Sequence, residues 1–303
     1  MTTNNGENVF LEDGKLIIKP TLQNETLLNT KFAKVNLTAD GTCTSDQWYN
    51  CWAATNATNH TMLSPVKSGR INTKGHASIR YGRVEVVAKM PKGDWLWPAI
   101  WMMPVNDVYG AWPASGEIDI VESRGNSHEY SDGGNNFVSS TLHWGPNENL
   151  DAYWRTTNKH GLLRSTFSDS FRTFGLEWSE KYIYTYVDTR LRQVLYTPFK
   201  NPLWNRGKFP QVDSDTVITN PWITTGQDNT PFDTPFYLIL NLAVGGTNGY
   251  FADPDVRKPW DNNALNASAY FWGARDDWYP TWTEGKSQLE IKSVKMWQQC
   301  DGQ

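Results

Sequence analysis

Apolar and polar residues alternate along many short stretches of this chain, with the two-residue period of a strand that has one buried face. A helical period of apolar residues is kept for three turns in few windows. Turn-forming residues separate the alternating runs at short intervals, as in a β-sandwich or jelly roll. The runs that we predict as strands are Lys15–Ile18, Tyr81–Met90, Gly116–Glu122, Val138–His143, Phe171–Trp178, Tyr182–Val187, Phe236–Val244 and Gln288–Trp297.

The chain shows no repeat, linker or low-complexity break, so we expect a single all-β domain that spans residues 1–303. Two long segments, about residues 200–234 and 250–286, have no regular period and are rich in Pro, Trp, Asn and Asp. Loops this long in a compact domain are usually functional or flexible.

One predicted strand carries three carboxylates within six residues: Glu117, Asp119 and Glu122. Like charges this close repel one another, so a purely structural strand would spread them out. Strict alternation places Glu117 and Asp119 on one face and turns Glu122 away from it. A β-bulge near Ile120–Val121 would absorb one residue and return Glu122 to the face of the other two acids.

With that bulge, the Cα atoms of the two glutamates would lie about 13 Å apart, and their carboxyl groups could approach to about 5–6 Å. A retaining glycosidase needs a separation of about 5–5.5 Å, with one carboxylate as nucleophile and the other as acid/base. An aspartate between them would keep their pKa values apart. The spacing alone leaves two alternatives open: a cation site, which usually needs more oxygen ligands, and a solvated sheet face without a role.

Charge and hydropathy restrict the possible partners. The formal net charge is -4 and no basic run stands out, which argues against nucleic acid. The longest apolar stretches, such as Phe236–Val244, are too short to cross a bilayer. Many of the 16 Trp lie beside Gly, Pro, Asp or Asn, and Trp in such settings more often lines an exposed groove, where its ring can stack on a sugar.

Other features bear on the compartment. The start MTTNNGENV has neither a charged nor an apolar leader, so we expect a mature form with an added Met or a cytosolic protein. Cys43 and Cys51 could close a short loop as a disulfide, or all three cysteines, Cys300 included, could be ordinary thiols. The cysteines do not make a convincing zinc site. Five glycosylation sequons favour an extracellular protein: Asn24, Asn36, Asn56, Asn59 and Asn266.

The residues around the acidic strand resemble a known family. The runs WPAIW, WPASGEIDIVESRGN, STLHWG and FYLILNLAVGGTNGYF are similar to the laminarinase branch of glycoside hydrolase family sixteen, over most of the chain from Arg70 onward. The core pattern, Glu-x-Asp-x-x-Glu after Trp-Pro-x-x-Gly, is highly specific. Licheninases of the unbulged type have one residue fewer, so Val121 argues against that branch. The long loops look most like animal laminarinases and β-1,3-glucan recognition proteins.

The resemblance implies a jelly-roll sandwich of two curved antiparallel sheets with a substrate cleft along the concave face. It also implies that Glu117 is the nucleophile, Asp119 the assisting aspartate and Glu122 the acid/base. The other candidates are sugar-binding residues: Trp112 beside the scissile bond, Trp97 and Trp101 as stacking aromatics, His143 near the acids, and Arg70 and Asn241 as polar contacts. The tryptophans could instead belong to the core, and His143 and Asn241 could be structural.

Three functions are compatible with this resemblance. The first is a retaining endo-β-1,3-glucanase that acts on laminarin-type glucan as a secreted monomer. The second is a glucan recognition protein, but such proteins typically lose one or both glutamates, and both are present here. The third is a relative that cleaves mixed-linkage glucan or another polymer, or a transglycosylase.

We expect no cofactor. Many family members have an acidic residue in the last strand that helps to bind calcium. Lys292 occupies that place in this chain, which argues against the usual calcium site unless Glu290 substitutes.

Overall fold

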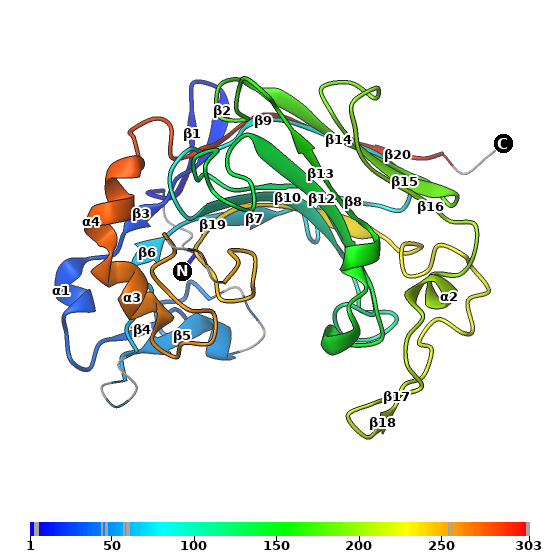
Figure 1. Ribbon diagram of the computed structural model, residues 1–303, viewed down its shortest axis with the longest axis horizontal. Helices are drawn as coiled ribbons and strands as arrows, with labels where there is room; N and C mark the ends of the chain where they lie inside the picture. The colour runs from blue at the N-terminus through cyan, green and yellow to red at the C-terminus, as the bar shows by residue number, and fades with distance from the viewer. Residues whose placement is uncertain are drawn as a thin grey trace.

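The computed structural model describes residues 1–2, 6–43, 45, 48–56, 58, 61–253, 255 and 257–300. Two curved antiparallel sheets are stacked on one another (Figure 1). In spatial order, the first sheet contains β1 (Val9–Glu12), β2 (Lys15–Ile18), β20 (Leu289–Gln298), β9 (Gly82–Lys89), β14 (Arg172–Trp178), β15 (Tyr182–Val187) and β16 (Gln193–Pro198). The second contains β13 (Thr157–Gly161), β12 (Phe137–His143), β11 (Glu117–Ser123), β10 (Leu96–Pro104), β19 (Phe236–Val244) and β7 (Arg70–Asn72), with β8 (Ser78–Ile79) also paired to β19.

Short elements extend beyond the two sheets. Three two-stranded ribbons pair β3 (Thr21–Leu22) with β6 (Val66–Lys67), β4 (Lys34–Asn36) with β5 (Trp52–Ala54), and β17 (Val212–Asp213) with β18 (Thr216–Val217). The helices are α1 (Glu25–Leu28), α2 (Leu203–Gly207), α3 (Ala267–Gly273), α4 (Arg275–Trp278), and the 3₁₀ turns η1 (Trp48–Cys51), η2 (Glu148–Leu150), η3 (Tyr153–Arg155) and η4 (Tyr279–Thr281). None of the helices in the described ranges is long and apolar enough to span a membrane.

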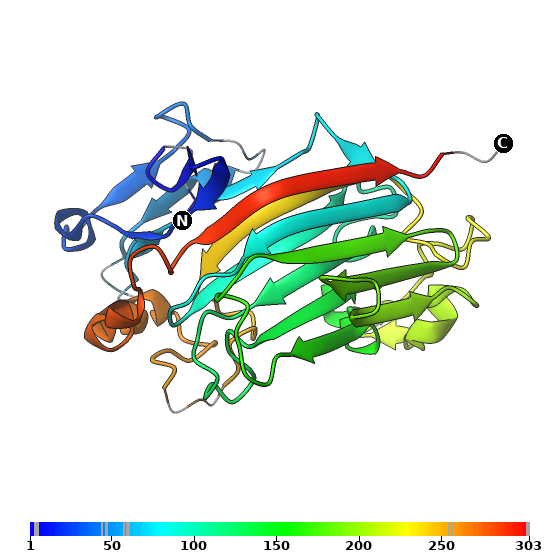
Figure 2. The ribbon, with the colours of Figure 1, turned by 90° about the horizontal axis from the view of Figure 1, so that it is seen from above.

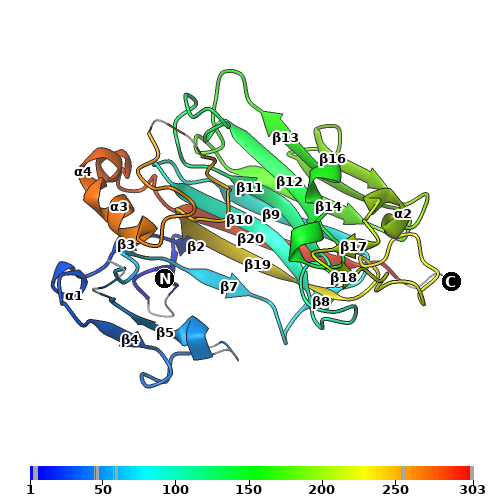
Figure 3. The same cartoon turned by 60° about the horizontal axis from the view of Figure 1, so that its bottom comes forward.

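The two long irregular segments fold at opposite ends of the strands. Figure 3 shows α3 and α4 at one end, and α2 with the β17–β18 ribbon at the other. Both sets extend to the side of the second sheet that faces away from the first (Figure 1). The second sheet therefore presents its concave face between two sets of loops.

The prediction of a β-sandwich is confirmed, and each of the eight predicted runs lies on a strand of the two sheets. The central strand β10 was not among them. It contains Pro98, and proline is rare inside a sheet. Pro98 is tolerated at this position because the pairing of β10 with β11 ends one residue away, at Ala99 and Glu122.

The alternation of the strands explains the core. In β9 every second side chain is buried, and Val84, Val86 and Ala88 are 0% exposed. These side chains pack in one cluster with apolar residues of the second sheet, such as Ile100 and Ile118. Burial of this apolar surface between the sheets is the main force that holds the sandwich together.

The interpretation that tryptophans in loops line a groove is wrong for Trp95, Trp260 and Trp278, which are 2%, 5% and 1% exposed. They form a second apolar cluster with Phe251 and Phe271 beside α3 and α4. Trp95 and Trp260 meet edge to face with ring centres 5.0 Å apart, a favourable geometry for aromatic rings. These tryptophans stabilise the long loops from within.

The predicted disulfide between Cys43 and Cys51 is present, with Cα atoms 5.5 Å apart, and Cys300 is an exposed free thiol. Of the sequon asparagines, Asn24, Asn36 and Asn56 are exposed and Asn266 is half-buried. Asn59 lies outside the described residues.

The carboxylate that could substitute in a family calcium site, Glu290, is held in ion pairs. Glu290 on β20 is 3% exposed, and its two oxygens bind Lys15, at 3.0 Å, and Lys89. Strand β20 (red in Figure 2) lies between β2 and β9, which carry Lys15 and Lys89, so the two lysines come from the strands on either side of Glu290. Lys292 is the extra residue of a bulge and is exposed. Two ammonium groups thus neutralise the carboxylate that could have substituted as a calcium ligand.

This ion-pair cluster should stabilise the fold in a pH-dependent way. Burial alone would raise the pKa of Glu290, but hydrogen bonds from Lys89 and Lys15 outweigh this effect and lower the pKa. The stabilisation is therefore present above the unfolded-state pKa and is lost as the pH falls through the folded-state value. We expect Glu290→Gln to reduce the free energy of unfolding by about 1–3 kcal/mol at pH 7 and by much less at pH 3. Urea titrations at both pH values measure this, with the exposed Glu284→Gln as control. An equal loss at both pH values would contradict it.

Candidate active site

The strand β11 carries the three acids and contains a bulge. Asp119 pairs with Thr141 of β12, whereas Glu122 pairs with Ser139, so two residues of β11 lie opposite one residue of β12. The register with β10 shifts at the same place. The predicted bulge is therefore present. Its two residues, Ile120 and Val121, are 2% and 1% exposed and both belong to the core.

As a result, Glu117, Asp119 and Glu122 share the concave face. Glu117 and Glu122 are partly exposed there, and Asp119 between them is 3% exposed. Burial raises the pKa of Glu117, and the neighbouring Asp119 carboxylate raises it further. Burial likewise raises the pKa values of Asp119 and Glu122. Three carboxyls in this environment favour keeping at least one proton near neutral pH.

Each glutamate accepts a hydrogen bond from a different tryptophan. Trp112 Nε1 donates to Glu117 Oε2 at 2.7 Å, and Trp97 Nε1 donates to Glu122 Oε1 at 2.8 Å. Both bonds favour the ionised carboxylate and so oppose the effect of burial on the pKa. The structure therefore brings Trp97 and Trp112 to the acids as hydrogen-bond donors, a role that the sequence alone did not indicate.

His143 connects the acid cluster to a fourth carboxylate. It pairs with Glu117 across β11 and β12, its Nε2 lies 3.2 Å from Asp119 Oδ2, and its Nδ1 lies 2.5 Å from Asp151 Oδ2. Burial alone would lower the pKa of His143, but the neighbouring carboxylates of Asp119 and Asp151 raise it to about 12. These carboxylates favour the imidazolium form, whose charge partly balances that of the acids.

Glu117, Asp119 and His143 also form a candidate metal-binding set, because their ligand atoms lie within 4.8 Å of one another. A metal ion needs the neutral imidazole, whereas both ring nitrogens of His143 face carboxylates, which favour the protonated ring. The donor set fits an acid cluster that shares protons better than it fits a metal site.

Arg70, Trp101 and Asn241 form a second group on the same face. Trp101 Nε1 donates to Asn241 Oδ1 at 2.6 Å, and the guanidinium of Arg70 lies 4.7 Å from the centre of the Trp101 ring. Asn241 pairs with Ala99, which pairs with Glu122, so this group lies two strands from the proposed acid/base. Within the described chain the NH₂ group of Asn241 has no hydrogen-bond partner, and it is available to a ligand.

Sequence reasoning missed several residues that support the site. Tyr250 stacks face to face on Trp97, with ring centres 3.9 Å apart and planes within 4°, and covers one of its two faces. Arg124 lies 4.2 Å from the Tyr250 ring centre, so an arginine, a tyrosine and a tryptophan form one stack that ends at Glu122. The only available signal for Tyr250 was its place in the run NGYF, because a contact between distant segments has no local pattern.

Two further residues were missed on the other side of Glu117. Asp151 holds His143, and its second oxygen accepts the backbone N–H groups of Trp144 and Tyr153. The Tyr153 ring, 46% exposed, stacks on His143 with ring centres 5.4 Å apart. Trp112, 38% exposed, has its ring centre 5.6 Å from that of His143. Two partly exposed aromatic rings therefore lie against His143 next to the acids.

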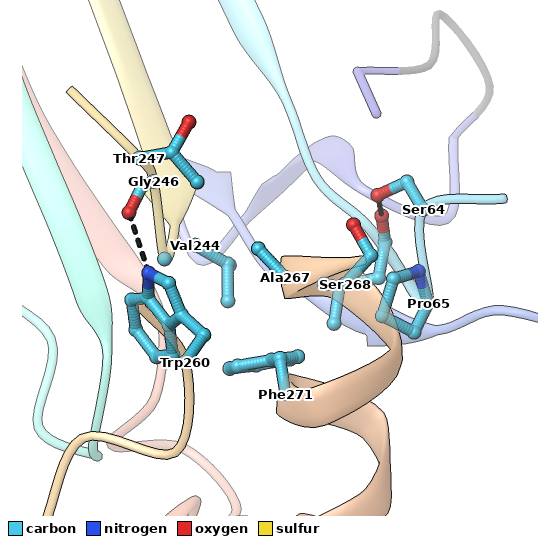
Figure 4. A pocket seen from close by; sticks show the side chains of 11 residues that line it. Ser64, Pro65, Val244, Gly246, Thr247, Trp260, Ala267, Ser268 and Phe271 are labelled. Atoms are coloured by element: carbon cyan, nitrogen blue, oxygen red, sulfur yellow. Dashed lines mark hydrogen bonds between the residues drawn. The ribbon is translucent and has the colours of Figure 1, made fainter. Parts of the chain in front are cut away.

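A cavity of about 240 Å³ lies beside the stack at Trp97, between the end of β19 and α3 (Figure 4). Trp260 Nε1 donates to the carbonyl of Gly246 at its edge, and a Cβ at position 246 would meet the Trp97 ring at 3.4 Å. Phe271 and Ser268 face it from α3. No charged side chain lines this cavity, so it adds nothing to the chemistry of the acids.

Comparison with known proteins identifies the family. Residues 25–234 match glycosyl hydrolases family 16, which is more than half of the chain. This protein belongs to that family. The chain of this family 16 member also matches the laminarinase catalytic domain of Thermotoga maritima MSB8 over 99% of its length and 83% of that chain, with a TM-score of 0.57 and 23% identity. That likeness establishes the shared jelly-roll fold.

The relatives of this family 16 chain include both binding proteins and enzymes. It is 39% identical over 307 residues to the β-1,3-glucan-binding protein of Penaeus monodon, covering 97% of this chain and 81% of that one. It is 33% identical to β-1,3-glucan-binding protein 1 of Galleria mellonella, of which it spans 56%. It is also 33% identical over 249 residues to glucan endo-1,3-beta-glucosidase A1 of Niallia circulans, covering 80% of this chain and 28% of that protein.

The contact between His143 and Asp151 can be tested directly. Replacing Asp151 by Asn removes a carboxylate that favours the imidazolium, so we expect the pKa of His143 to fall by about 1–3 units. Nitrogen NMR of the imidazole as a function of pH measures this shift. The exposed Asp169→Asn, far along the chain, serves as control, and an unchanged His143 titration in Asp151→Asn would contradict the assignment.

Proposed function

We propose that this protein is a retaining endo-β-1,3-glucanase. The observation that carries the proposal is the bulge at Ile120–Val121, because it directs Glu122 to the same face as Glu117. Two carboxyls on one face, separated by an aspartate and each held by a tryptophan N–H, suit the double displacement of a retaining enzyme. A binding site would gain nothing from acids that repel one another.

In the proposed mechanism, Glu117 attacks the anomeric carbon while Glu122 protonates the glycosidic oxygen and releases the leaving sugar. Glu122, now ionised, then takes a proton from water, which attacks the glycosyl-enzyme ester and frees Glu117. Asp119, paired with the imidazolium of His143, lies between them and keeps their pKa values apart.

The polymer class follows from the relatives and from the surroundings of the acids. Relatives named for β-1,3-glucan include both a binding protein and a glucosidase, so the shared ligand is this glucan. Arg70, Trp101 and Asn241 offer hydrogen bonds and an aromatic surface to sugars on one side of the acids. Trp112 and Tyr153 offer partly exposed rings on the other.

We further propose that the protein acts outside the cell, as one domain and as a monomer. The disulfide Cys43–Cys51 suits an oxidising compartment, and three of the sequon asparagines are exposed.

A second candidate function is glucan recognition without hydrolysis, which the 39% identity to the Penaeus monodon glucan-binding protein favours.

Product analysis separates these two functions. We expect the protein to release short oligosaccharides from laminarin, with the β-anomer appearing first in proton NMR because two displacements retain the configuration. Glu117→Gln should lower kcat at least about 1,000-fold, because the covalent intermediate cannot form. The exposed Glu148→Gln, which carries the same change, should keep full activity. Laminarin binding without cleavage by the unmutated protein would favour the recognition function. Faster cleavage of mixed-linkage glucan would change the proposed substrate.

The two tryptophans allow the roles of the glutamates to be told apart. Trp112→Phe removes the hydrogen bond that favours ionised Glu117, so the pKa of the nucleophile rises. In the plot of kcat/KM against pH, the acid limb should then move to higher pH by about one unit. Trp97→Phe raises the pKa of Glu122 for the same reason and moves the alkaline limb up instead. The two variants control for each other in pH–rate profiles on laminarin. If Trp112→Phe instead moved the alkaline limb and Trp97→Phe the acid limb, Glu117 would be the acid/base.

A further inference from the structure

A buried serine lies directly opposite the bulge of β11. Asp119 pairs with Thr141 and Glu122 with Ser139, so Ser140 faces the two bulge residues. A bulge leaves its extra residue without regular pairing in the ladder. The hydroxyl of Ser140 donates to the carbonyl of Ile120 at 2.7 Å, so a side chain of β12 bonds the backbone of the bulge.

The Ser140 hydroxyl is itself held by the other sheet. Thr185 Oγ1 on β15 donates to Ser140 Oγ at 2.8 Å and accepts the backbone N–H of Leu195 on β16 at 3.0 Å. A carbonyl can only accept, so the one hydroxyl hydrogen of Ser140 goes to Ile120, and the bond between Thr185 and Ser140 uses the hydrogen of Thr185. The amide of Leu195 can only donate, so Thr185 accepts from it. The direction of all three bonds is therefore determined.

This relay of Leu195, Thr185 and Ser140 is enclosed in the core. Ser140 and Thr185 are both 0% exposed, and the neighbouring inward residues of β12, Val138 and Leu142, are apolar. An apolar residue at position 140 would suit the packing but would remove a donor from a buried carbonyl, which is costly in the core. The hydroxyl bonds a carbonyl of the bulge itself, so its role is tied to the bulge.

We propose that Ser140 is a positioning residue for Glu122, with Thr185 as its support. By fixing the Ile120 carbonyl, the relay fixes the bulge, and the bulge sets the direction of Glu122 relative to Glu117. This inference rests on the proposed function, since it assigns a part in catalysis to residues that touch no substrate.

The test compares three variants on laminarin. Ser140→Ala should lower kcat about 10- to 100-fold, because a small displacement of a catalytic group has effects of that size. Its Kd for laminarin should stay near that of the unmutated protein, since Trp101, Trp112 and Asn241 lie on other segments. Thr185→Val should show a smaller loss, because Ser140 can still donate. The matched control is Thr197→Val: Thr197, on β16, is 0% exposed, and its hydroxyl has no hydrogen-bond partner among the described residues.

Hydrogen exchange adds a readout that does not depend on activity. Exchange of the segment 117–123 should be faster in Ser140→Ala than in the unmutated protein, and unchanged in Thr197→Val. A kcat within about twofold of the unmutated value, with unchanged exchange in β11, would overturn the proposal. If Ser140→Ala does not fold, the test uses Thr185→Val. The proposal then requires a lower kcat and faster exchange of the segment 117–123 in Thr185→Val than in Thr197→Val. If the unmutated protein binds laminarin without hydrolysing it, the proposed function fails, and the exchange data alone decide whether Ser140 holds the bulge.

Discussion

The arrangement of the concave face depends on the backbone register of β11. A strand presents alternate residues to opposite faces, so a shift of one residue moves an entire set of side chains to the other side. Here the shift is confined to Ile120 and Val121, and both side chains enter the core. Glu122 returns to the concave face while the apolar packing remains continuous. The same local irregularity thus serves the hydrophobic core and the acid cluster.

The ionisation of the three carboxyls depends on neighbouring side chains rather than on solvent. Buried carboxyls resist ionisation, and the two tryptophan N–H groups together with the His143 imidazolium counter that resistance. Asp151 is part of this balance although it faces none of the glutamates directly, because it keeps His143 charged. The charges of the site therefore extend beyond the residues that would meet a sugar.

Most of the fold and the bulge in the acidic strand could be predicted from the sequence, because both follow from local periodicity, whereas the roles of the acids were implied by the resemblance to a family. The alternation identified the strands, and the out-of-phase Glu122 pointed to the bulge. What could not be predicted depends on contacts between distant segments. Tyr250 reaches Trp97 from a long loop, and the loop tryptophan Trp260 turned out to be buried because other loops cover it. No short pattern distinguishes an aromatic ring that will be covered from one that will stay exposed.

The bulge also determines how the length of this strand can change. Deleting Val121 would restore strict alternation from Glu117 through Asp119 to Glu122, and all three acids would still share one face. Deleting a residue between Glu117 and Asp119 would instead split them between the two faces. A shortened strand would have no bulge carbonyl for Ser140, whose hydroxyl would become a buried donor without an acceptor. A deletion at 121 is thus tolerated best with an apolar residue at 140, and we expect the two positions to change together as such chains diverge.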